Sequence, residues 1–567
     1  MEWDWEGFRH AAAAFPKPSG IDFSYGTAGF RLDASLLAST VFRAGVLAAL
    51  RSLSMKSATG LVITASHNPA SDNGVKLVDP GGGMLAMRWE PHANAMANAS
   101  DEHALTEVVR KIIKEESIAF GDESCGKVLL ARDTRPSGQI LLAAASQGVA
   151  AVAGVAPVDM GILTTPQLHW MVCALNKDQP ATEVNYYSHL SQAFRTLEQL
   201  RPDKSVRRSS LASESIIIDG ANGVGALKLL QLQELLENLQ FEVRNCGRAG
   251  EGGLNDGVGA DFVQKEKAFP RNFDKSDALK KCASIDGDAD RLVYFYFISS
   301  TISSPSTFNL LDGDKISALF ARFIRNQLQS LVEDVEEKPI ITTTLVAGYG
   351  DVRVGVVQTA YANGASTKYL QQELGLEVSL TSTGVKYLHE KASEYDIGIY
   401  FEANGHGTIL FREEFLAFLR TKHMWGKPSI HRLLAVSEMI NQAVGDALSG
   451  ILMVEIVLMY LGWSIQDWND IYADLPSKQL KVKVANRAAI RTTASETKVV
   501  YPSELQKAID TEVGKYDGGR SFVRPSGTED IVRIYAEATT QSTADALAQA
   551  VAFHVYRLAG GVGPQPS

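Results

Sequence analysis

Cysteine is scarce in this sequence. Four cysteines are spread over 567 residues, and no two of them form a CxxC pair. Neither a disulfide framework nor a cysteine-rich zinc site is therefore supported, and a reducing compartment is expected. The first ten residues are acidic and aromatic, whereas a secretory signal begins with basic residues and continues with apolar ones. We therefore expect a cytoplasmic protein.

The sequence also lacks an excess of basic residues and long apolar runs. Lys and Arg number 55 against 65 Asp and Glu, which gives a formal net charge of −10. Non-specific nucleic-acid binding ordinarily requires a basic face, so no nucleic-acid partner is expected. Residues 141–158 contain Ser and Gln among Ala, Gly and Val, and residues 451–463 are too short to cross a bilayer and contain Glu455. No membrane partner is expected, and the oligomeric state is left open between monomer and dimer.

The length of the chain predicts about four domains. Short apolar runs alternate with helical stretches over most of the sequence, which is typical of α/β layers. The last hundred residues differ and indicate a small α+β domain. The expected fold is three related α/β domains with mixed sheets and a smaller C-terminal α+β domain. The expected domain ranges are 1–177, 178–300, 301–466 and 467–567.

The first candidate site is the segment TASHNP at residues 64–69, which follows a predicted strand at residues 61–63. A serine on a turn after a strand is expected to be exposed and able to act as a nucleophile or to carry a phosphoryl group. Adjacent Ser66 and His67 do not form a hydrolase dyad, because neighbouring side chains of an extended segment point apart. The sequence has neither a GxSxG nor an HExxH motif. Taken alone, the segment is more often a polar turn.

The second candidate site is an acidic loop before a very apolar strand. Asp286, Asp288 and Asp290 alternate with Gly and Ala, so their carboxylates are expected to project to one side. Such hard oxygen donors suit Mg²⁺. An EF-hand would require Gly and Glu where this chain has Arg291 and Phe297. In a solvated acidic turn, the three carboxylates would repel one another without a cation. We therefore favour a magnesium site.

Two further loops lie in the second half of the chain. Arg524, Ser526, Gly527 and Thr528 lie between two predicted strands, and their guanidinium, hydroxyl and amide groups can surround a phosphate. Arg533 is expected to add a second guanidinium. An ordinary hairpin turn would also fit this position.

The other loop, EANGHG at residues 402–407, follows a predicted strand. Glu402 can accept hydrogen bonds from sugar hydroxyls, and Asn404 offers the donor and acceptor that an amide requires. Gly405 belongs to the same candidate site. A glycine-rich turn with an incidental histidine is the alternative.

Together, the four loops resemble the signatures of the α-D-phosphohexomutase superfamily, in the same order and over nearly the whole chain. TASHNP is similar to the phosphoserine loop, DGDADR to the metal loop, EANGHG to the sugar loop and RPSGTE to the phosphate loop. Further segments are similar to the branch that acts on N-acetylglucosamine phosphates: residues 26–31, 163–169, 358–364 and 383–386.

The resemblance implies a phosphoserine mutase that interconverts N-acetylglucosamine 6-phosphate and 1-phosphate through a 1,6-bisphosphate, for UDP-N-acetylglucosamine biosynthesis. Ser66 would carry the phosphoryl group and hold Mg²⁺ together with the three aspartates. A sugar 1,6-bisphosphate is an expected activator that primes unphosphorylated Ser66. A phosphosugar is the expected small-molecule partner, and the four domains are expected to surround a central cleft in which the intermediate turns around.

The resemblance also implies roles for other residues. Lys76 and Lys386 match basic active-site positions, Arg31 and Arg291 are expected to contact phosphate, and His67 is counted among the catalytic residues. The general base is left open, because an ordinary lysine is protonated at pH 7. The loop at 524–528 with Arg533 would hold the phosphate that is not being transferred.

The same resemblance assigns the sugar to Glu402, Asn404 and Gly405. Glu402 would contact the sugar hydroxyls and Asn404 the acetamido group, which makes Asn404 the clue to specificity. Three alternatives stay open: a phosphoglucomutase or phosphomannomutase, a Mg²⁺-dependent sugar phosphatase, and a non-catalytic regulator that binds sugar phosphates.

Overall fold

The computed structural model describes residues 3–27, 29–120, 126–202, 215–298, 307–331, 343–346, 349–422, 426–527 and 529–566. The chain folds into two compact units. The first unit comprises Met1–Asp312 and Ala435–Gly462, and the second comprises Gly313–Leu434 and Trp463–Ser567. In the described part of the chain, no helix combines the length and the apolar character needed to cross a membrane.

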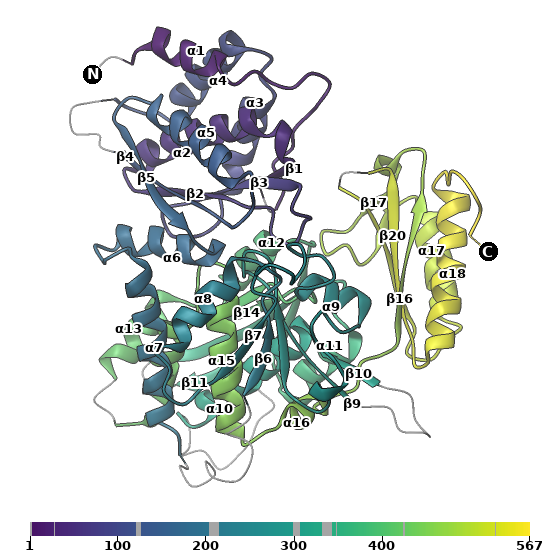
Figure 1. Ribbon diagram of the computed structural model, residues 1–567. Coiled ribbons are helices and arrows are strands. Elements are labelled where there is room, and N and C mark those ends of the chain that lie inside the picture. Colours follow the sequence, from purple (N-terminus) through teal and green to yellow (C-terminus); the bar gives the residue numbers. More distant parts are fainter. Residues whose placement is uncertain are drawn as a thin grey trace. The chain divides into compact units, whose positions relative to one another are not determined.

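The first sheet of the first unit is mixed and has the order β1-β3-β2-β4-β5. Its strands are β1 (Phe30–Asp33), β2 (Thr59–Ile63), β3 (Asp72–Val78), β4 (Gly126–Arg132) and β5 (Val155–Ile162). Successive side chains of β4 point to opposite faces, where Val128 and Leu130 join one core and Leu129 and Ala131 another. Both faces are therefore covered by helices (Figure 1). The helices of this region are α1 (Trp5–Ala13), α2 (Ala38–Met55), α3 (Glu90–Asn98), α4 (Glu102–Glu115), α5 (Gly138–Ala150), α6 (Thr165–Asn176) and α7 (Glu183–Gln199).

Helices α2 and α5 pack closely because glycines lie at their contact. A Cβ on Gly45 would come within 2.3 Å of the Ala145 carbonyl oxygen, and one on Gly148 within 2.0 Å of the Phe42 carbonyl oxygen. The apolar run at residues 141–158 is thus explained by packing inside the unit, as a helix followed by a strand.

The second sheet has the order β10-β9-β8-β6-β7 and repeats the pairing pattern of the first. Reading from β10, two antiparallel pairs are followed by two parallel pairs, as they are in the first sheet from β1. Its strands are β6 (Ile216–Asp219), β7 (Phe241–Arg244), β8 (Cys282–Ile285), β9 (Leu292–Ile298) and β10 (Thr307–Leu311). Helices α8 (Val224–Gln233), α9 (Ala260–Glu266) and α15 (Ala447–Leu461) belong to this region. The shared pattern agrees with related α/β domains.

The expected domain ranges stay a prediction, but two elements lie differently from them. Strand β10 falls in the expected third range, yet it pairs with β9 of the second sheet. Helix α15 falls in the same range, yet it belongs to the first unit. This helix is apolar on all sides and is buried, and its one acidic group, Glu455, forms an ion pair with Lys281 beside β8.

The second unit contains a mixed sheet of order β11-β12-β14-β15, with β13 paired parallel to β12. The strands are β11 (Thr343–Val346), β12 (Gly350–Thr359), β13 (Glu377–Thr381), β14 (Ile397–Phe401) and β15 (Gly407–Phe411). The helices are α10 (Gly313–Gln329), α11 (Gly364–Lys368), α12 (Val385–Ala392), α13 (Glu413–Thr421), α14 (Pro428–Met439, which continues into the first unit) and α16 (Ile465–Asn469).

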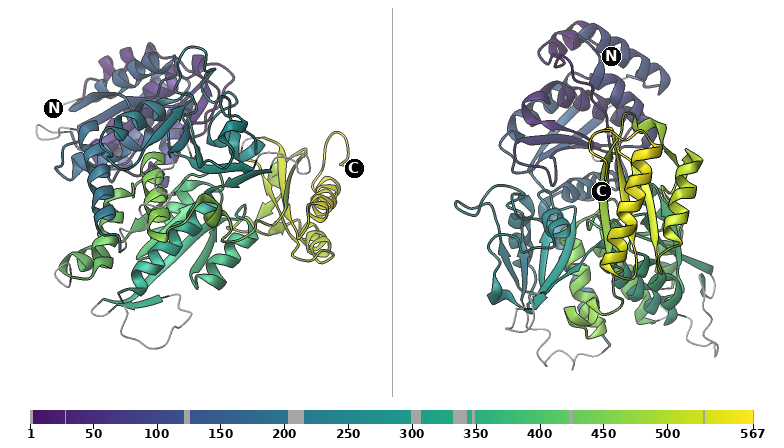
Figure 2. Two further views of the ribbon diagram at one scale, coloured as in Figure 1. Left: turned by 60° about the horizontal axis from the view of Figure 1, so that its bottom comes forward. Right: turned by 90° about the vertical axis from the view of Figure 1, so that its right-hand side faces the viewer.

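The C-terminal part of the second unit is a small antiparallel sheet with helices on one face (Figure 2). Strands β16 (Ser477–Lys483), β19 (Arg520–Pro525) and β20 (Ile531–Glu537) follow the order β16-β20-β19, beside the short pair β17 (Arg491–Thr492) and β18 (Val499–Tyr501). Helices α17 (Ser503–Val513) and α18 (Gln541–Leu558) share an apolar core with this sheet. The predicted α/β fold class with a final α+β domain is confirmed.

Candidate active site

Ser66 lies in a tight turn directly after β2. Its φ of 52° is in the left-handed region, and its backbone N–H donates to Thr64 Oγ1 over 3.0 Å. Its hydroxyl donates to Asp286 Oδ2 over 2.6 Å. The expectation that this serine is exposed is wrong, because the residue is 0% exposed. The turn places the hydroxyl against the acidic loop of the second sheet and not toward solvent.

Two side chains that the sequence analysis missed hold the serine turn. Arg135, fully buried after β4, donates to the carbonyl oxygens of Ser66 and Asn68, both over 2.9 Å, and its Nε pairs with Asp133 at 3.0 Å. Asn255 donates to the same two carbonyls over 2.8 and 3.0 Å. In the sequence, Asp133 and Arg135 are visible only as charged residues at the end of a predicted strand. Such charges are too common to indicate that they hold a different loop in place.

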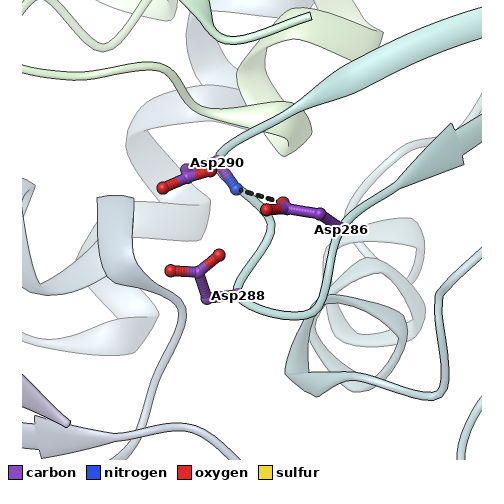
Figure 3. Close-up of side chains that lie close together, drawn as sticks. All are labelled: Asp286, Asp288 and Asp290. Carbon is purple, nitrogen blue, oxygen red and sulfur yellow. Dashed lines mark hydrogen bonds between the residues drawn. The ribbon is translucent and has the colours of Figure 1, made fainter. Parts of the chain in front are cut away.

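The acidic loop between β8 and β9 brings three carboxylates together (Figure 3). Oxygen atoms of Asp286, Asp288 and Asp290 lie within 4.8 Å of one another, and all three residues are buried. Asp286 Oδ1 accepts from the backbone N–H groups of Asp290 and Arg291 at 2.9 and 3.0 Å. Among the described residues, Asp288 Oδ1 is buried and has no hydrogen-bond partner. An unpaired buried carboxylate oxygen beside two others is a suitable ligand for a hard cation such as Mg²⁺.

The charges of this cluster are unevenly balanced. Burial raises the pKa of Asp286 well above its usual value, and the charges of Asp290 and Asp288 raise it further. Burial also acts to raise the pKa of Asp288, but its contacts with Lys76 and Thr165 bring it below the usual value. The Thr165 hydroxyl donates to Asp288 Oδ2 over 2.6 Å. Two protein cations face the three carboxylates: Lys76 contacts Asp288 and Asp290, and Arg291 Nε lies 3.9 Å from oxygens of Asp286 and Asp290.

Lys76 lies on β3 and is buried, not a solvated surface lysine. Its Nζ is 2.7 Å from Asp288 Oδ2 and 2.8 Å from Asp290 Oδ2. Burial acts to lower the pKa of Lys76, but the two carboxylates outweigh it and leave the pKa raised. Lys76 is therefore charged at neutral pH, which disfavours it as a general base.

His67 and two arginines complete the cluster in the first unit. His67 Nδ1 lies 3.5 Å from Ser66 Oγ, and burial, with the charge of Arg291, lowers its pKa to about 3, so its ring is neutral and a weak base. Arg291 pairs with Asp261 at 3.0 Å. Burial lowers the pKa of Arg31, whose Nη1 is 3.5 Å from Asn68 Oδ1. The structure thus brings together the predicted residues Ser66, His67, Lys76, Arg31, Arg291, Asp286, Asp288 and Asp290.

The predicted sugar loop lies between β14 and β15 in the second unit. Glu402 Oε1 accepts from the Gly384 N–H over 3.1 Å, and its Oε2 accepts from Asn404 Nδ2 over 3.2 Å. Gly405 has a φ of 86°, which closes the turn with a hydrogen bond to the Glu402 carbonyl. Gly384 immediately precedes α12, whose second residue is Lys386. The sugar loop and the segment with Lys386 are therefore neighbours.

The predicted phosphate loop joins β19 to β20. Ser526 donates its N–H to the Ile531 carbonyl over 2.9 Å, and the Gly527 carbonyl accepts from Arg487 over 3.0 Å. Thr528, which the resemblance assigned to this loop, lies outside the described residues. Arg524 Nε lies 2.9 Å from a carboxylate oxygen of Glu496, a residue that the sequence analysis did not consider.

The strand register adds a row of basic residues at the phosphate loop. Arg524 lies directly opposite Arg533, and Arg533 lies directly opposite Lys481 of β16. Like charges opposite one another destabilise a sheet. An anion bound beside the row would remove this repulsion. Lys481 was missed because register cannot be read from a single strand.

Comparisons with known proteins agree with these observations. The profile described as phosphoacetylglucosamine mutase AMG1, domain III, matches residues 312–463. Phosphoglucomutase/phosphomannomutase profiles match residues 44–104 and 98–181 (alpha/beta/alpha domain I) and 480–553 (C-terminal domain).

One curated relative is the phosphoacetylglucosamine mutase of Arabidopsis thaliana, 55% identical over 95% of this chain and 96% of the relative. The structure of Aspergillus fumigatus N-acetylphosphoglucosamine mutase in complex with GlcNAc-6P and magnesium superimposes with a TM-score of 0.87, at 40% identity over 99% of this chain and 100% of that one. A serine-to-alanine variant of that enzyme in complex with glucose 1,6-bisphosphate superimposes with a TM-score of 0.85. It is 39% identical over 98% of this chain and 99% of that one. This chain therefore belongs to the phosphoacetylglucosamine mutase family, whose members are phosphohexomutases.

Proposed function

We propose that the protein interconverts N-acetylglucosamine 6-phosphate and N-acetylglucosamine 1-phosphate by phosphoryl transfer through Ser66, and so supplies UDP-N-acetylglucosamine synthesis. The observation that carries this proposal is the 2.6 Å hydrogen bond from Ser66 Oγ to Asp286, within a cluster of three buried carboxylates. A phosphoryl group on Ser66 would add negative charge to that cluster. The arrangement is therefore productive only with a cation.

Mg²⁺ fits this donor set. Asp286, Asp288 and Asp290 would hold it together with an oxygen on Ser66, and the buried Asp288 Oδ1 offers a ligand atom. The related A. fumigatus enzyme was solved with magnesium. When bound, Mg²⁺ withdraws charge from the phosphoryl oxygens and so favours attack at phosphorus.

The chain's own cations would assist the transfer. Lys76, charged and buried against two of the aspartates, would stabilise negative charge on the moving phosphoryl group. Arg31 and Arg291 lie beside the serine turn and would contact the same oxygens. His67, with its lowered pKa, would contact the site as a neutral side chain.

Two transfers would complete the reaction. A sugar hydroxyl oxygen bonds to phosphorus as the bond from phosphorus to Ser66 Oγ breaks, which gives the 1,6-bisphosphate. The proton lost by the sugar hydroxyl balances the one that Ser66 Oγ takes up as it becomes a hydroxyl again. The intermediate then turns around and its other phosphoryl group returns to Ser66, so no phosphate is consumed. A sugar 1,6-bisphosphate would recharge an unphosphorylated Ser66.

Residues of the second unit would bind the parts of the substrate that do not react. Glu402 would accept hydrogen bonds from sugar hydroxyls, Asn404 would contact the acetamido group, and Gly405 would belong to the same sugar-binding loop. Lys386 lies two residues after Gly384, which donates to Glu402. The remote phosphate would be held by Arg524, Ser526, Gly527, Thr528 and Arg533. The row of opposed basic residues supports this assignment, because a bound anion would reduce their mutual repulsion.

The test is conversion of N-acetylglucosamine 6-phosphate with Mg²⁺ and catalytic glucose 1,6-bisphosphate, followed by phosphorus NMR. The wild-type protein should form the 1-phosphate, Ser66→Ala should form none, and Ser71→Ala, at an exposed position on the same loop, should keep full activity. Undiminished activity of Ser66→Ala would refute the phosphoserine mechanism. Faster turnover of glucose 6-phosphate than of the N-acetylated sugar would refute the substrate.

A further inference from the structure

Glu496 occupies a backbone position that side chains rarely adopt. It lies in the turn between β17 and β18, and its φ of 58° is in the left-handed region. Its N–H closes the turn onto the Thr493 carbonyl over 2.9 Å. Glycine or asparagine is preferred at such a position. A glutamate there points to a use for its side chain, since strained residues gather at functional sites.

The carboxylate of Glu496 joins the phosphate loop to the segment before α12. Its Oε2 accepts from the N–H and the hydroxyl of Thr383, over 3.0 and 2.5 Å, and lies 2.9 Å from Arg524 Nε. Ser382 adds a hydrogen bond of 2.6 Å to the Ala494 carbonyl in the same turn. The side chains of Glu496 and Arg524 are only 17% and 23% exposed. The contact is therefore largely shielded from solvent and less weakened by it than a surface ion pair.

This contact continues to the sugar loop. Gly384, the residue after Thr383, donates its N–H to Glu402 Oε1 over 3.1 Å. A chain of short polar contacts therefore runs from Arg524 through Glu496 and the Thr383–Gly384 backbone to Glu402. It connects the candidate phosphate site with the candidate sugar site of the same unit.

We propose that Glu496 is a positioning residue that orients Arg524 for the remote phosphate and keeps the phosphate loop in register with the sugar loop. The 2.9 Å contact with Glu496 is an ion pair at Nε without hydrogen-bond geometry. A guanidinium approached on that side can present its two terminal nitrogens to phosphate. Because Thr383 fixes the same carboxylate oxygen, Arg524 is held at a fixed place. The inference rests on the proposed mutase function, because it assigns the phosphate of that substrate to Arg524.

The opposite effect would follow if Glu496 only competed with phosphate for Arg524. In that case its removal would tighten phosphosugar binding. The two hydrogen bonds from Thr383 favour the positioning role over competition. Because they fix the Glu496 carboxylate, that carboxylate can in turn restrict the orientation of the Arg524 side chain. The two roles predict changes of opposite sign in KM.

The experiment compares Glu496→Gln, which removes the charge and keeps the shape, with Glu504→Gln at an exposed position of α17 in the same C-terminal region. We expect Glu496→Gln to raise the KM for N-acetylglucosamine 6-phosphate by about tenfold, the effect of losing the shielded ion pair with Arg524, and to change kcat much less. The Kd of the same phosphosugar, measured in a Ser66→Ala background without turnover, should rise in parallel. Glu504→Gln should behave as wild type.

Thr383 provides an independent check. Thr383→Ser keeps the hydroxyl and should leave KM near the wild-type value, whereas Thr383→Val should raise it in the same direction as Glu496→Gln. If the wild-type enzyme turns over its substrate, an unchanged or lowered KM in Glu496→Gln would overturn the inference. Absence of turnover in the wild type would instead refute the proposed function.

Discussion

At the scale of single residues, Arg135 shows how a neighbouring side chain holds the geometry of an active-site turn. Its guanidinium holds the Ser66 and Asn68 carbonyls, and its partner Asp133 accepts from the Thr64 hydroxyl over 2.7 Å. Thr64 Oγ1 in turn accepts from the Ser66 N–H. The left-handed turn of Ser66 is therefore held by groups that are themselves buried.

We expect Arg135→Lys to lower both activity and stability. A lysine has no planar fork, so it cannot reproduce the contacts with the carbonyls and Asp133, and part of a buried pair is left unsatisfied. The free energy of unfolding should fall by about 3 kcal/mol, and kcat should fall because Ser66 is no longer held. Denaturant unfolding and initial rates provide the measurement. Arg88→Lys, at a position 64% exposed, is the matched control, and an Arg135→Lys protein as active and stable as this control would contradict the account.

At the scale of elements, the sequence predicted the strands and turns that carry the candidate sites. Ser66, the aspartates, Glu402 and Arg524 lie in loops directly after strands or at a strand end, as expected from the alternation of apolar runs and turn residues. What could not be predicted depends on contacts distant in sequence. The burial of Ser66 depends on the loop that carries Asp286, 220 residues later. Strand β10 pairs with β9, and α15 belongs to the first unit, and neither contact leaves a local signal in the sequence.

The antiparallel pair of β19 and β20 contains basic residues that we expect to lower stability but to favour phosphosugar binding. Arg533 lies between Lys481 and Arg524, so Arg533→Gln should relieve repulsion and stabilise the phosphate-free protein by about 0.2–1 kcal/mol. The same change should raise the KM for the phosphosugar. Thermal unfolding with and without phosphosugar, and steady-state kinetics, test both parts.

Lys478→Gln is the control, because Lys478 lies opposite Ala536 on the outer strand. It should change neither stability nor KM in this way. A destabilised Arg533→Gln protein with an unchanged KM would show that Arg533 is a structural residue and not part of an anion site.

At the scale of the whole molecule, net charge says little about the substrate. The formal charge of −10 is an average over a chain with a buried carboxylate cluster, paired with Lys76, and a row of basic residues across the C-terminal sheet. The family could be recognised from the sequence because each of the four larger sheets in the described part of the chain contributes one short loop with its own chemistry. The supports of those loops, such as Arg135, Asn255 and Glu496, became visible only in the folded chain.

The acidic cluster predicts that magnesium stabilises the whole protein more at higher pH. The folded-state pKa of Asp286 is raised by burial and by its acidic neighbours, so the metal-free fold tends to hold a proton there and loses stability as pH rises through that pKa. Mg²⁺ takes the place of this proton, so its affinity should increase with pH. The rise in Tm on adding Mg²⁺ should therefore be larger at a pH above the raised pKa of Asp286 than at a pH below it. An equal or smaller rise at the higher pH would contradict this charge balance.

The central claim is that Ser66 carries the transferred phosphoryl group, and peptide mass spectrometry tests it most directly. The protein is treated with glucose 1,6-bisphosphate, digested, and mapped before and after a chase with N-acetylglucosamine 6-phosphate. We predict that the phosphoryl group is found on the peptide containing Ser66 and is lost from it during the chase as the bisphosphorylated sugar forms. A phosphoryl group on another residue, or one that stays on Ser66 throughout the chase, would contradict the account.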